Sequence, residues 1–253
     1  MSIKSKVLAT AATLTLVGGV GVAGAVTAGS AAAATPSCGN SCINVFSHQF
    51  GTHAEPNFVV DVLRQGEKVG QPIILFRTAN FDPAEDWTVA FQGTVADFFA
   101  AGLVSAAVNL HYGGGAAGFP NDPAFENEYA PFGVDSGLCL GVAATAFNDE
   151  GVTLQPCGVS SKTVWILDVA DSPTTTLVGG YVPLVNGSDT NFSHPFVLTY
   201  PNESVPTDKP RPQIVVTNLT GFSNASPGTF IPGPELGTVD VNQLWGADFG
   251  ILK

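Results

Sequence analysis

Short runs of β-branched and apolar residues, separated by turns rich in Gly, Pro, Asn and Asp, are the main pattern of this chain. A run at residues 57–63 is followed by a polar turn at 64–70. A second run at 71–76 leads through a turn at 82–86 to the run at 87–91. Short runs bounded by turn residues predict β-strands and hairpins, and long helical periodicity is scarce. We therefore expect an all-β protein.

The same order of elements recurs twice more along the chain. The further strands are predicted at residues 138–143, 152–157 and 164–167 in the second copy and at 195–200, 213–217 and 241–245 in the third. Each copy ends in one of the three tryptophans, Trp87, Trp165 and Trp245, which are almost evenly spaced. A recurring unit of this kind predicts a repeat architecture. We expect three pseudo-repeats, with the tryptophans in a structural role.

Loop insertions are predicted in three segments that do not follow the repeat, near residues 94–134, 168–194 and 201–237. In the first of them, Thr-Val-Ala-Asp at 94–97 is typical of a helix start and would begin a helix over 98–108. The β-branched and aromatic residues there, with Gly102 among them, favour paired strands over that helix. The second segment is rich in Ser, Thr, Gly and Asp and predicts an exposed loop.

The N-terminus has the pattern of an export signal. Two lysines precede a run of small and apolar residues at 7–26, and the alanines at 32–34 offer the Ala-x-Ala pattern that signal peptidases accept. Glycines make the run less apolar than a Leu-rich membrane span. We predict a signal peptide at 1–34, a single domain at 35–253 and a secreted, extracellular protein of bacterial type.

Charge narrows the classes of partner. The whole chain has 9 Lys+Arg against 21 Asp+Glu, for a formal net charge of -12. Loss of the signal peptide with its two lysines would make the mature chain more acidic still. Such a surface repels phosphate groups, and no basic stripe focuses attraction. We therefore expect no nucleic-acid partner and no membrane partner.

The four cysteines are Cys38, Cys42, Cys139 and Cys157. An even number in an exported chain predicts disulfides, and four cysteines allow three pairings. We favour Cys38–Cys42, which closes a short local loop, with Cys139–Cys157, which closes a loop of hairpin size. A zinc site is the alternative, but the Cys-x3-Cys pair lacks a nearby second ligand pair of the usual spacing.

The repeated tracts resemble the ricin-B-type lectin family, whose three subdomains each carry a Gln-x-Trp signature. The match is strict at Gln243-Leu244-Trp245 and degenerate at Glu85-Asp86-Trp87 and Thr163-Val164-Trp165. Val60-Asp61-Val62 resembles the family's Val-Asp-Val strand, and Cys139 with the tract at 154–157 resembles its disulfide pair. The resemblance implies a β-trefoil in which each Trp caps the point where a subdomain's hairpin meets the shared core.

The resemblance also implies shallow sugar pockets, which need an acidic group, an aromatic platform and amide donors. The first copy keeps Asp61 at the acidic position and Phe76 at the platform. Ile74 and Ala84 stand at the amide positions and cannot form hydrogen bonds through their side chains. We therefore expect a first site that retains its carboxyl group and its ring but has lost much of its polar specificity.

The other two copies are further from a complete site. In the second, Gly141 stands at the acidic position and Gln155 at the platform, so we expect that site to be lost. The third keeps the amides Asn242 and Gln243, but its acidic position is occupied by Thr199. The predicted ligand contacts of this copy are therefore the two amides.

Catalytic and metal-binding patterns are weaker. The chain has no Gly-x-Ser-x-Gly nucleophile motif. His111-Tyr112-Gly113-Gly114-Gly115 is similar to an esterase oxyanion segment but favours a glycine-rich loop. His48 and His53, with Glu55, lack a third clear ligand. We predict no enzymatic activity, no metal site and no cofactor.

The interpretation we favour is a secreted β-trefoil that binds carbohydrate, with Asp61 and Phe76 as its best contacts. The first alternative is a trefoil that has lost sugar binding and acts as a structural or protein-binding module, which the missing amides favour. The second alternative is a secreted hydrolase built around His111 and the acidic residues of 122–128.

Overall fold

The computed structural model describes residues 42–51, 57–79, 82–115, 121–168, 181–202, 211–220 and 239–249. Every described residue belongs to the compact unit Ala32–Lys253. The predicted signal peptide at 1–34 lies outside the described residues. Within the described part of the chain, no helix is long and apolar enough to cross a membrane.

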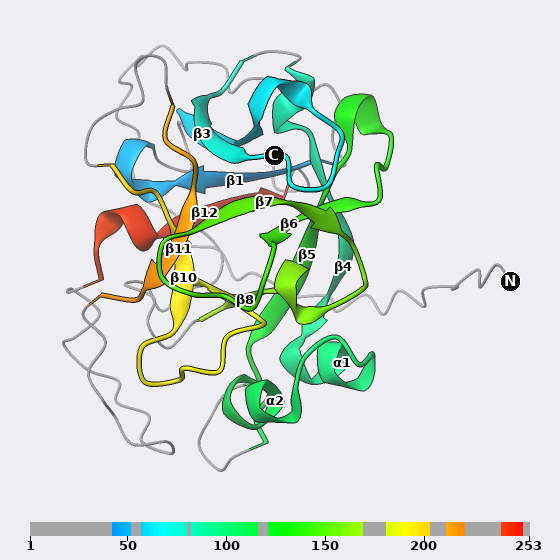
Figure 1. Ribbon diagram of the computed structural model, residues 1–253, viewed down its shortest axis with the longest axis vertical. Coiled ribbons are helices and arrows are strands. Elements are labelled where there is room, and N and C mark those ends of the chain that lie inside the picture. The colour runs from blue at the N-terminus through cyan, green and yellow to red at the C-terminus, as the bar shows by residue number, and fades with distance from the viewer. Residues whose placement is uncertain are drawn as a thin grey trace, which may run out of the picture. The chain divides into compact units, whose positions relative to one another are not determined.

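The described residues form twelve strands, four for each repeat predicted from the sequence (Figure 1). The first repeat contains β1 (Ile43–Ser47), β2 (Phe58–Val62), β3 (Ile73–Arg77) and β4 (Trp87–Thr94). The second contains β5 (Pro123–Tyr129), β6 (Leu138–Val142), β7 (Glu150–Pro156) and β8 (Trp165–Leu167). The third contains β9 (Leu184–Asn186), β10 (Phe196–Thr199), β11 (Val215–Asn218) and β12 (Trp245–Phe249).

The first and fourth strands of the repeats form a closed ring. Antiparallel pairs join β1 to β12, β4 to β5, β5 to β8 and β8 to β9. A bridge between Val182 and Trp245 links the chain before β9 to β12, and β1 contacts β4. Closure into a ring removes the exposed edges that an open sheet would present.

The second and third strands of each repeat form a hairpin, and the three hairpins join one another. The hairpins are β2–β3, β6–β7 and β10–β11. β7 also pairs with β11, and single bridges link Pro72 to Thr153 and Ile74 to Gln213. A six-stranded ring capped by a triangle of three hairpins is a β-trefoil, so the predicted fold is confirmed.

One hydrogen bond recurs in all three repeats and attaches each hairpin to the ring. Each Trp is almost fully buried and its indole N–H donates to a main-chain carbonyl in the first strand of its own hairpin. The pairs are Trp87 with Val60 (2.9 Å), Trp165 with Leu140 (2.9 Å) and Trp245 with Leu198 (2.7 Å). A buried indole N–H without an acceptor would cost about 1–3 kcal/mol, so each Trp fixes its hairpin as well as filling the core.

The residue two positions before the Trp accepts a hydrogen bond from a main-chain N–H that lies just after the hairpin. Oε1 of Glu85 accepts from the N–H of Ala79 at 2.9 Å in the first repeat. Oε1 of Gln243 accepts from the N–H of Thr220 at 2.8 Å in the third. The degenerate Glu-x-Trp signature therefore keeps the structural contact that the strict Gln-x-Trp signature makes.

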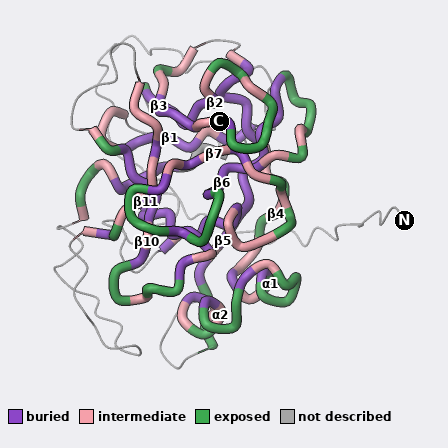
Figure 2. The backbone as a smooth tube through the Cα atoms, viewed as in Figure 1, coloured by how far each residue is buried: buried purple, intermediate pink, exposed green. Residues whose placement is uncertain are grey.

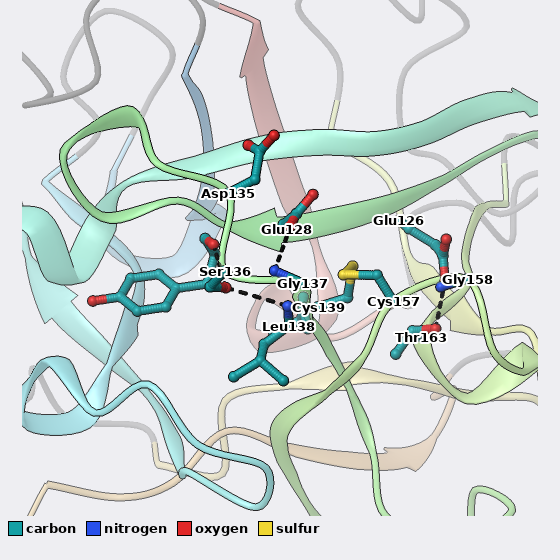
Figure 3. Close-up of a disulfide and its surroundings, with 12 residues drawn as sticks. Glu126, Glu128, Asp135, Ser136, Gly137, Leu138, Cys139, Cys157, Gly158 and Thr163 are labelled. Atoms are coloured by element: carbon teal, nitrogen blue, oxygen red, sulfur yellow. Dashed lines mark hydrogen bonds between the residues drawn. A yellow bond between two sulfur atoms is a disulfide. The ribbon is translucent and has the colours of Figure 1, made fainter. Parts of the chain in front are cut away.

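The second repeat makes the equivalent contact with a residue from another strand. Thr163 stands at the signature position, and its side chain is shorter than Glu or Gln. Oε1 of Glu126 in β5 accepts from the N–H of Gly158 at 2.9 Å, and Oγ1 of Thr163 donates to the same oxygen at 2.5 Å (Figure 3). Glu126 thus compensates for the short side chain at the signature position.

The disulfide between Cys139 and Cys157 is confirmed, and it joins β6 to the residue that follows β7 (Figure 3). The two Cα atoms are 5.0 Å apart, as expected for a bridge across a hairpin. Cys42 is also disulfide-bonded, and its predicted partner Cys38 lies outside the described residues.

The segment after β4 forms two helices, so the preference for paired strands in this segment is wrong. Thr94 and Asp97 form a reciprocal capping box at the start of α1 (Val95–Ala100). Ser105 accepts from the N–H of Val108 at the start of α2 (Ala106–Tyr112). Each cap contributes about 1 kcal/mol, which outweighs the small helix propensity deficits of the β-branched and aromatic residues.

Two strands of the ring lie within segments that were predicted as insertions. β5 lies within 94–134 and is the first strand of the second repeat. β9 lies within 168–194, where an exposed loop was expected, yet all three of its residues are buried. β5 mixes acidic and aromatic residues and β9 has only three residues, so neither produces a clear hydrophobic run.

Two hydrophobic clusters form the core. The larger one fills the ring and the hairpin cap and contains all three tryptophans. The smaller one packs the apolar faces of α1 and α2 against residues of β5, β8, β9 and β10. Figure 2 shows the strands as largely buried and the outer sides of the two helices as exposed. The helical insertion is therefore attached to the trefoil through its own apolar contacts.

Asn127 interrupts the larger cluster with a buried amide. In β5 it lies two residues before Tyr129, which pairs with Trp87. The equivalent residues, two positions before those that pair with Trp245 and Trp165, are the apolar Val45 and Leu184. Its side chain is fully buried, and neither polar atom has a hydrogen-bond partner among the described residues. Burial of an amide without a partner is costly.

We predict that Asn127→Leu raises the free energy of unfolding by about 1–3 kcal/mol, because the unpaired amide is replaced by an apolar side chain of similar volume. Urea denaturation at neutral pH measures the change. The matched control is Asn186→Leu, which removes a donor to the Lys162 carbonyl and an acceptor for the Ser188 N–H and should lower stability. A loss of stability in both variants would contradict the prediction.

Candidate functional site

A cavity of ≈ 580 Å³ opens beside the hairpin β2–β3 of the first repeat. The hairpin turn η3 (Leu63–Gln65) and the 3-10 helix η4 (Pro83–Glu85) supply part of its wall. Its lining consists of Asp61, Leu63, Arg64, Gln65, Ile74, Phe76, Asp82, Ala84 and Arg211. The structure therefore places all four positions that were assigned to the first sugar site around this one space, which we call the first-repeat cavity.

Strand register identifies the equivalent positions in the other repeats. Asp61 pairs with Ile74 and directly follows the residue whose carbonyl accepts from Trp87. By the same two criteria Gly141 and Thr199 are its counterparts, as the sequence indicates. The three positions differ in what surrounds them.

The counterpart site in the second repeat is filled by its own chain. A Cβ atom built on Gly141 would lie 2.8 Å from the main-chain oxygen of Lys162 and 2.8 Å from Cγ2 of Thr163. A side chain at this position would therefore collide with main-chain atoms that cannot move away cheaply. This repeat has no room for an acidic group.

The counterpart site in the third repeat is closed by hydrogen bonds between side chains. Oγ1 of Thr199 lies 2.8 Å from Oγ1 of Thr217, and Nε2 of Gln243 donates to that same Thr217 oxygen at 2.9 Å. Gln243 is 1% exposed and its amide oxygen is also occupied, so it has no polar atom to offer a ligand. Nδ2 of Asn242 donates to the carbonyl of Tyr200 at 3.0 Å. Oδ1 of Asn242 is buried without a hydrogen-bond partner among the described residues. Gln243 is therefore fully engaged within the chain, whereas Asn242 is engaged only through its amide nitrogen.

The protonation state of Asp61 determines which hydrogen bonds the first-repeat cavity can offer a ligand. It is 4% exposed, yet its carboxyl group makes no hydrogen bond or ion pair with another described residue. The pKa of Asp61 is raised to about 8, mainly by burial and also by the nearby carboxylates of Asp82 and Glu85, while Arg211 lowers it. At neutral pH the group is mainly protonated and can both donate and accept a hydrogen bond.

Phe76 is half-buried and carries a cation on its ring. The guanidinium carbon of Arg211 lies 3.5 Å from the ring centroid, which is a cation–π contact. Arg211 belongs to the third repeat and reaches the first-repeat cavity because the bridge between Ile74 and Gln213 joins the two hairpins. Sequence reasoning missed Arg211, since no local pattern marks a residue that is brought in by another repeat.

The hairpin turn at the edge of the cavity is held in a costly conformation. Arg64 and Gln65 have φ values of 58° and 54°, in the left-handed region that L-residues with side chains rarely adopt. Nε2 of Gln71 donates to the carbonyl of Leu63, and Nε2 of Gln65 donates to Oδ1 of Asp82 at 3.2 Å. Conformations of this kind cost about 1–3 kcal/mol each and cluster at ligand sites.

Three residues of the hydrolase alternative, His111, Glu126 and Glu128, take part in packing or in turns. His111 stacks on Phe192 with ring centroids 4.5 Å apart, and burial lowers the pKa of its imidazole. Glu126 and Glu128 accept hydrogen bonds from main-chain N–H groups of nearby turns (Figure 3). Among the described residues no group of His, Cys, Asp and Glu could hold a metal ion. His53 lies outside those residues.

No protein-family model and no curated protein matches the chain. Among solved structures it is similar to ThreeFoil, a designed 3-fold symmetric protein, at 13% identity and a TM-score of 0.46, over 82% of this chain and 97% of that one. It is similar to the Rhizoctonia solani agglutinin at 15% identity and a TM-score of 0.41, over 82% and 94% of the chains. A mosquitocidal holotoxin matches at 13% identity and a TM-score of 0.44, over 83% of this chain and 17% of the toxin. The fold assignment depends on the strand pairing alone.

We predict that the free energy of unfolding of Asp61→Asn increasingly exceeds that of the wild-type protein as pH rises. The pKa of Asp61 is about 8 in the folded state against an ordinary 3.8, so the folded state holds an extra proton between these values. The stabilisation from that proton is complete below the lower value and is lost as pH rises through the higher one. Asn resembles the protonated carboxyl group and does not titrate.

The stability advantage of Asp61→Asn should therefore grow between about pH 5 and pH 8, by up to about 1.4 kcal/mol per pH unit. Urea denaturation at several pH values measures it. Glu85 is present in both proteins, so its own titration largely cancels in the difference. The matched control is Asp135→Asn at an exposed carboxylate outside the cavity. An advantage that is constant with pH would show that Asp61 is ionised in the folded protein.

Proposed function

We propose that the protein is a secreted carbohydrate-binding β-trefoil and that the first-repeat cavity holds the sugar. The main support for this proposal is the environment of the Asp61 carboxyl group. Buried polar groups in proteins are nearly always hydrogen-bonded, yet this carboxyl group borders a cavity without a partner among the described residues. A sugar hydroxyl both donates and accepts, and so it complements a protonated carboxyl group.

The remaining properties of the cavity support a small polar ligand. Its volume of ≈ 580 Å³ falls within the usual range of about 300–1,000 Å³ for small-molecule sites. Phe76, Ile74 and Ala84 provide apolar surface for the C–H groups of a pyranose ring. The strained turn at Arg64 and Gln65 supports a functional role for this edge of the fold.

A structural or protein-binding trefoil without sugar binding is the second candidate function. The sites at Gly141 and Thr199 favour it, because described residues of the chain itself occupy two of the three equivalent positions. We also propose that the protein is not an enzyme, since His111, Glu126 and Glu128 are engaged in packing and in turns. Disulfide bonding supports export to an oxidising compartment.

We predict that a glycan array finds a sugar ligand for the wild-type protein and that Asp61→Ala and Phe76→Ala each weaken its binding by about tenfold or more. The first variant removes the unpaired hydrogen-bonding group, and the second removes the apolar ring. Asp135→Ala, at an exposed site outside the cavity, is the control and should bind as the wild type does. Failure to bind any sugar, or full binding by Asp61→Ala, would sink the proposal.

We expect no activity in a broad esterase and glycosidase screen of the purified mature protein. His111 is stacked on the ring of Phe192, and Glu126 and Glu128 accept hydrogen bonds from turn N–H groups, so these groups are not poised for proton transfer. His111→Ala is the control variant. Hydrolytic activity in the wild-type protein that this variant loses would restore the hydrolase alternative.

A further inference from the structure

The first-repeat cavity concentrates positive charge in an acidic protein. Two of the three arginines of the chain, Arg64 and Arg211, line it, although the whole chain has a net charge of -12. Asp82 also belongs to the lining, and its Oδ1 already accepts from Nε2 of Gln65 and from the N–H of Ala84. Asp61 is the other acidic residue of the lining, and burial raises its pKa, so at neutral pH the two arginines outweigh the acidic groups of this wall.

Arg211 holds an unused donor set in this space. Its guanidinium group lies over the Phe76 ring, it makes no ion pair with a described residue, and its Nε is buried without a hydrogen-bond partner. A guanidinium group offers planar N–H donors that match the two oxygens of a carboxylate or sulfate. The Phe76 ring holds the guanidinium group in one orientation and so reduces the entropy lost when an anion binds.

The Arg211 contact also changes what the Phe76 ring can do. The face of the ring under the guanidinium group is covered, so a pyranose cannot stack on that face while Arg211 remains there. A neutral sugar would have to displace the cation and lose the cation–π contact. A sugar that carries an anion keeps the contact and gains a charge-assisted hydrogen bond.

We propose that the first-repeat cavity selects acidic sugars, that is, pyranoses that carry a carboxylate or a sulfate group. The anionic group pairs with the guanidinium of Arg211, and a ring hydroxyl bonds to the carboxyl group of Asp61. This inference rests on the proposed carbohydrate-binding function, because it names the class of sugar for the same site.

The protonation of Asp61 is consistent with an anionic ligand. Burial raises the pKa of Asp61, so at neutral pH the carboxyl group carries little charge and does not repel the ligand. Glu85 lies near it, and burial raises its pKa to about 7. Arg64 and Arg211 oppose the charge of Asp82 and whatever fraction of Glu85 is ionised. The long-range repulsion from the rest of the acidic surface is screened beyond about 10 Å at 0.1 M salt.

Isothermal titration calorimetry with matched methyl glycosides tests the proposal. The pairs are glucuronide with glucoside, galacturonide with galactoside, and galactoside 6-sulfate with galactoside, so that carboxylate and sulfate are distinguished. We expect at least one acidic sugar to bind about 10- to 100-fold more tightly than its neutral partner, as one charge-assisted pair predicts. Arg211→Met should abolish the preference, and Arg211→Lys should retain part of it. Arg77→Met, at an exposed arginine outside the cavity, should keep it all.

Three outcomes would overturn the inference and leave carbohydrate binding intact: a preference for neutral sugars, an acidic preference that survives Arg211→Met, or tighter binding of neutral sugars by Arg211→Met. The last would show that Arg211 covers the platform instead of recognising a ligand. Absence of binding to every sugar would overturn both the inference and the proposed function. Near-ultraviolet circular dichroism of each variant establishes that the fold is kept, and Arg211→Lys tests the charge if Arg211→Met does not fold.

Discussion

The hydrogen bond from each buried indole N–H to the first strand of its hairpin is the constraint on which the rest of the structure depends. A buried donor must be paired, and the acceptor in each repeat is the same carbonyl in the middle of that strand. The bond therefore fixes each hairpin on the ring at one register. That register places Asp61, Gly141 and Thr199 at equivalent points, so the scaffold creates three potential sites before any binding residue is considered.

The three sites have diverged because the scaffold does not depend on what occupies them. At Gly141 the neighbouring main chain fills the space, and at Thr199 a cluster of hydroxyl and amide groups closes it. At Asp61 a carboxyl group borders a cavity and has no hydrogen-bond partner within the described part of the chain. The signature residue varies in the same way, since Glu126 from another strand makes the contact that Thr163 is too short to make. Packing of the tryptophans holds the fold while the polar positions change.

The carboxyl group and the ring of the candidate site could be predicted from the sequence, but the positive charge beside them could not. Asp61, Ile74 and Phe76 lie on the two strands of one hairpin, so their spacing along the chain fixes their spacing in space. Arg211 lies far along the chain and joins them through a bridge between hairpins of different repeats. The sequence predicted a sugar site that had lost much of its polar specificity, and the structure adds to it a guanidinium group that makes no ion pair with a described residue.

The sequence by itself determined the features that nearest neighbours decide: the hairpin strands, the turns between them, the threefold recurrence of Trp and the disulfide across one hairpin. Tertiary structure decided the rest. The polar strand β5 and the three-residue strand β9 exist because the ring offers them partners on both sides, and two capped helices form where strand propensity had favoured a hairpin. Contacts between distant segments depend on the closure of the whole ring, and no local pattern of side chains records that closure.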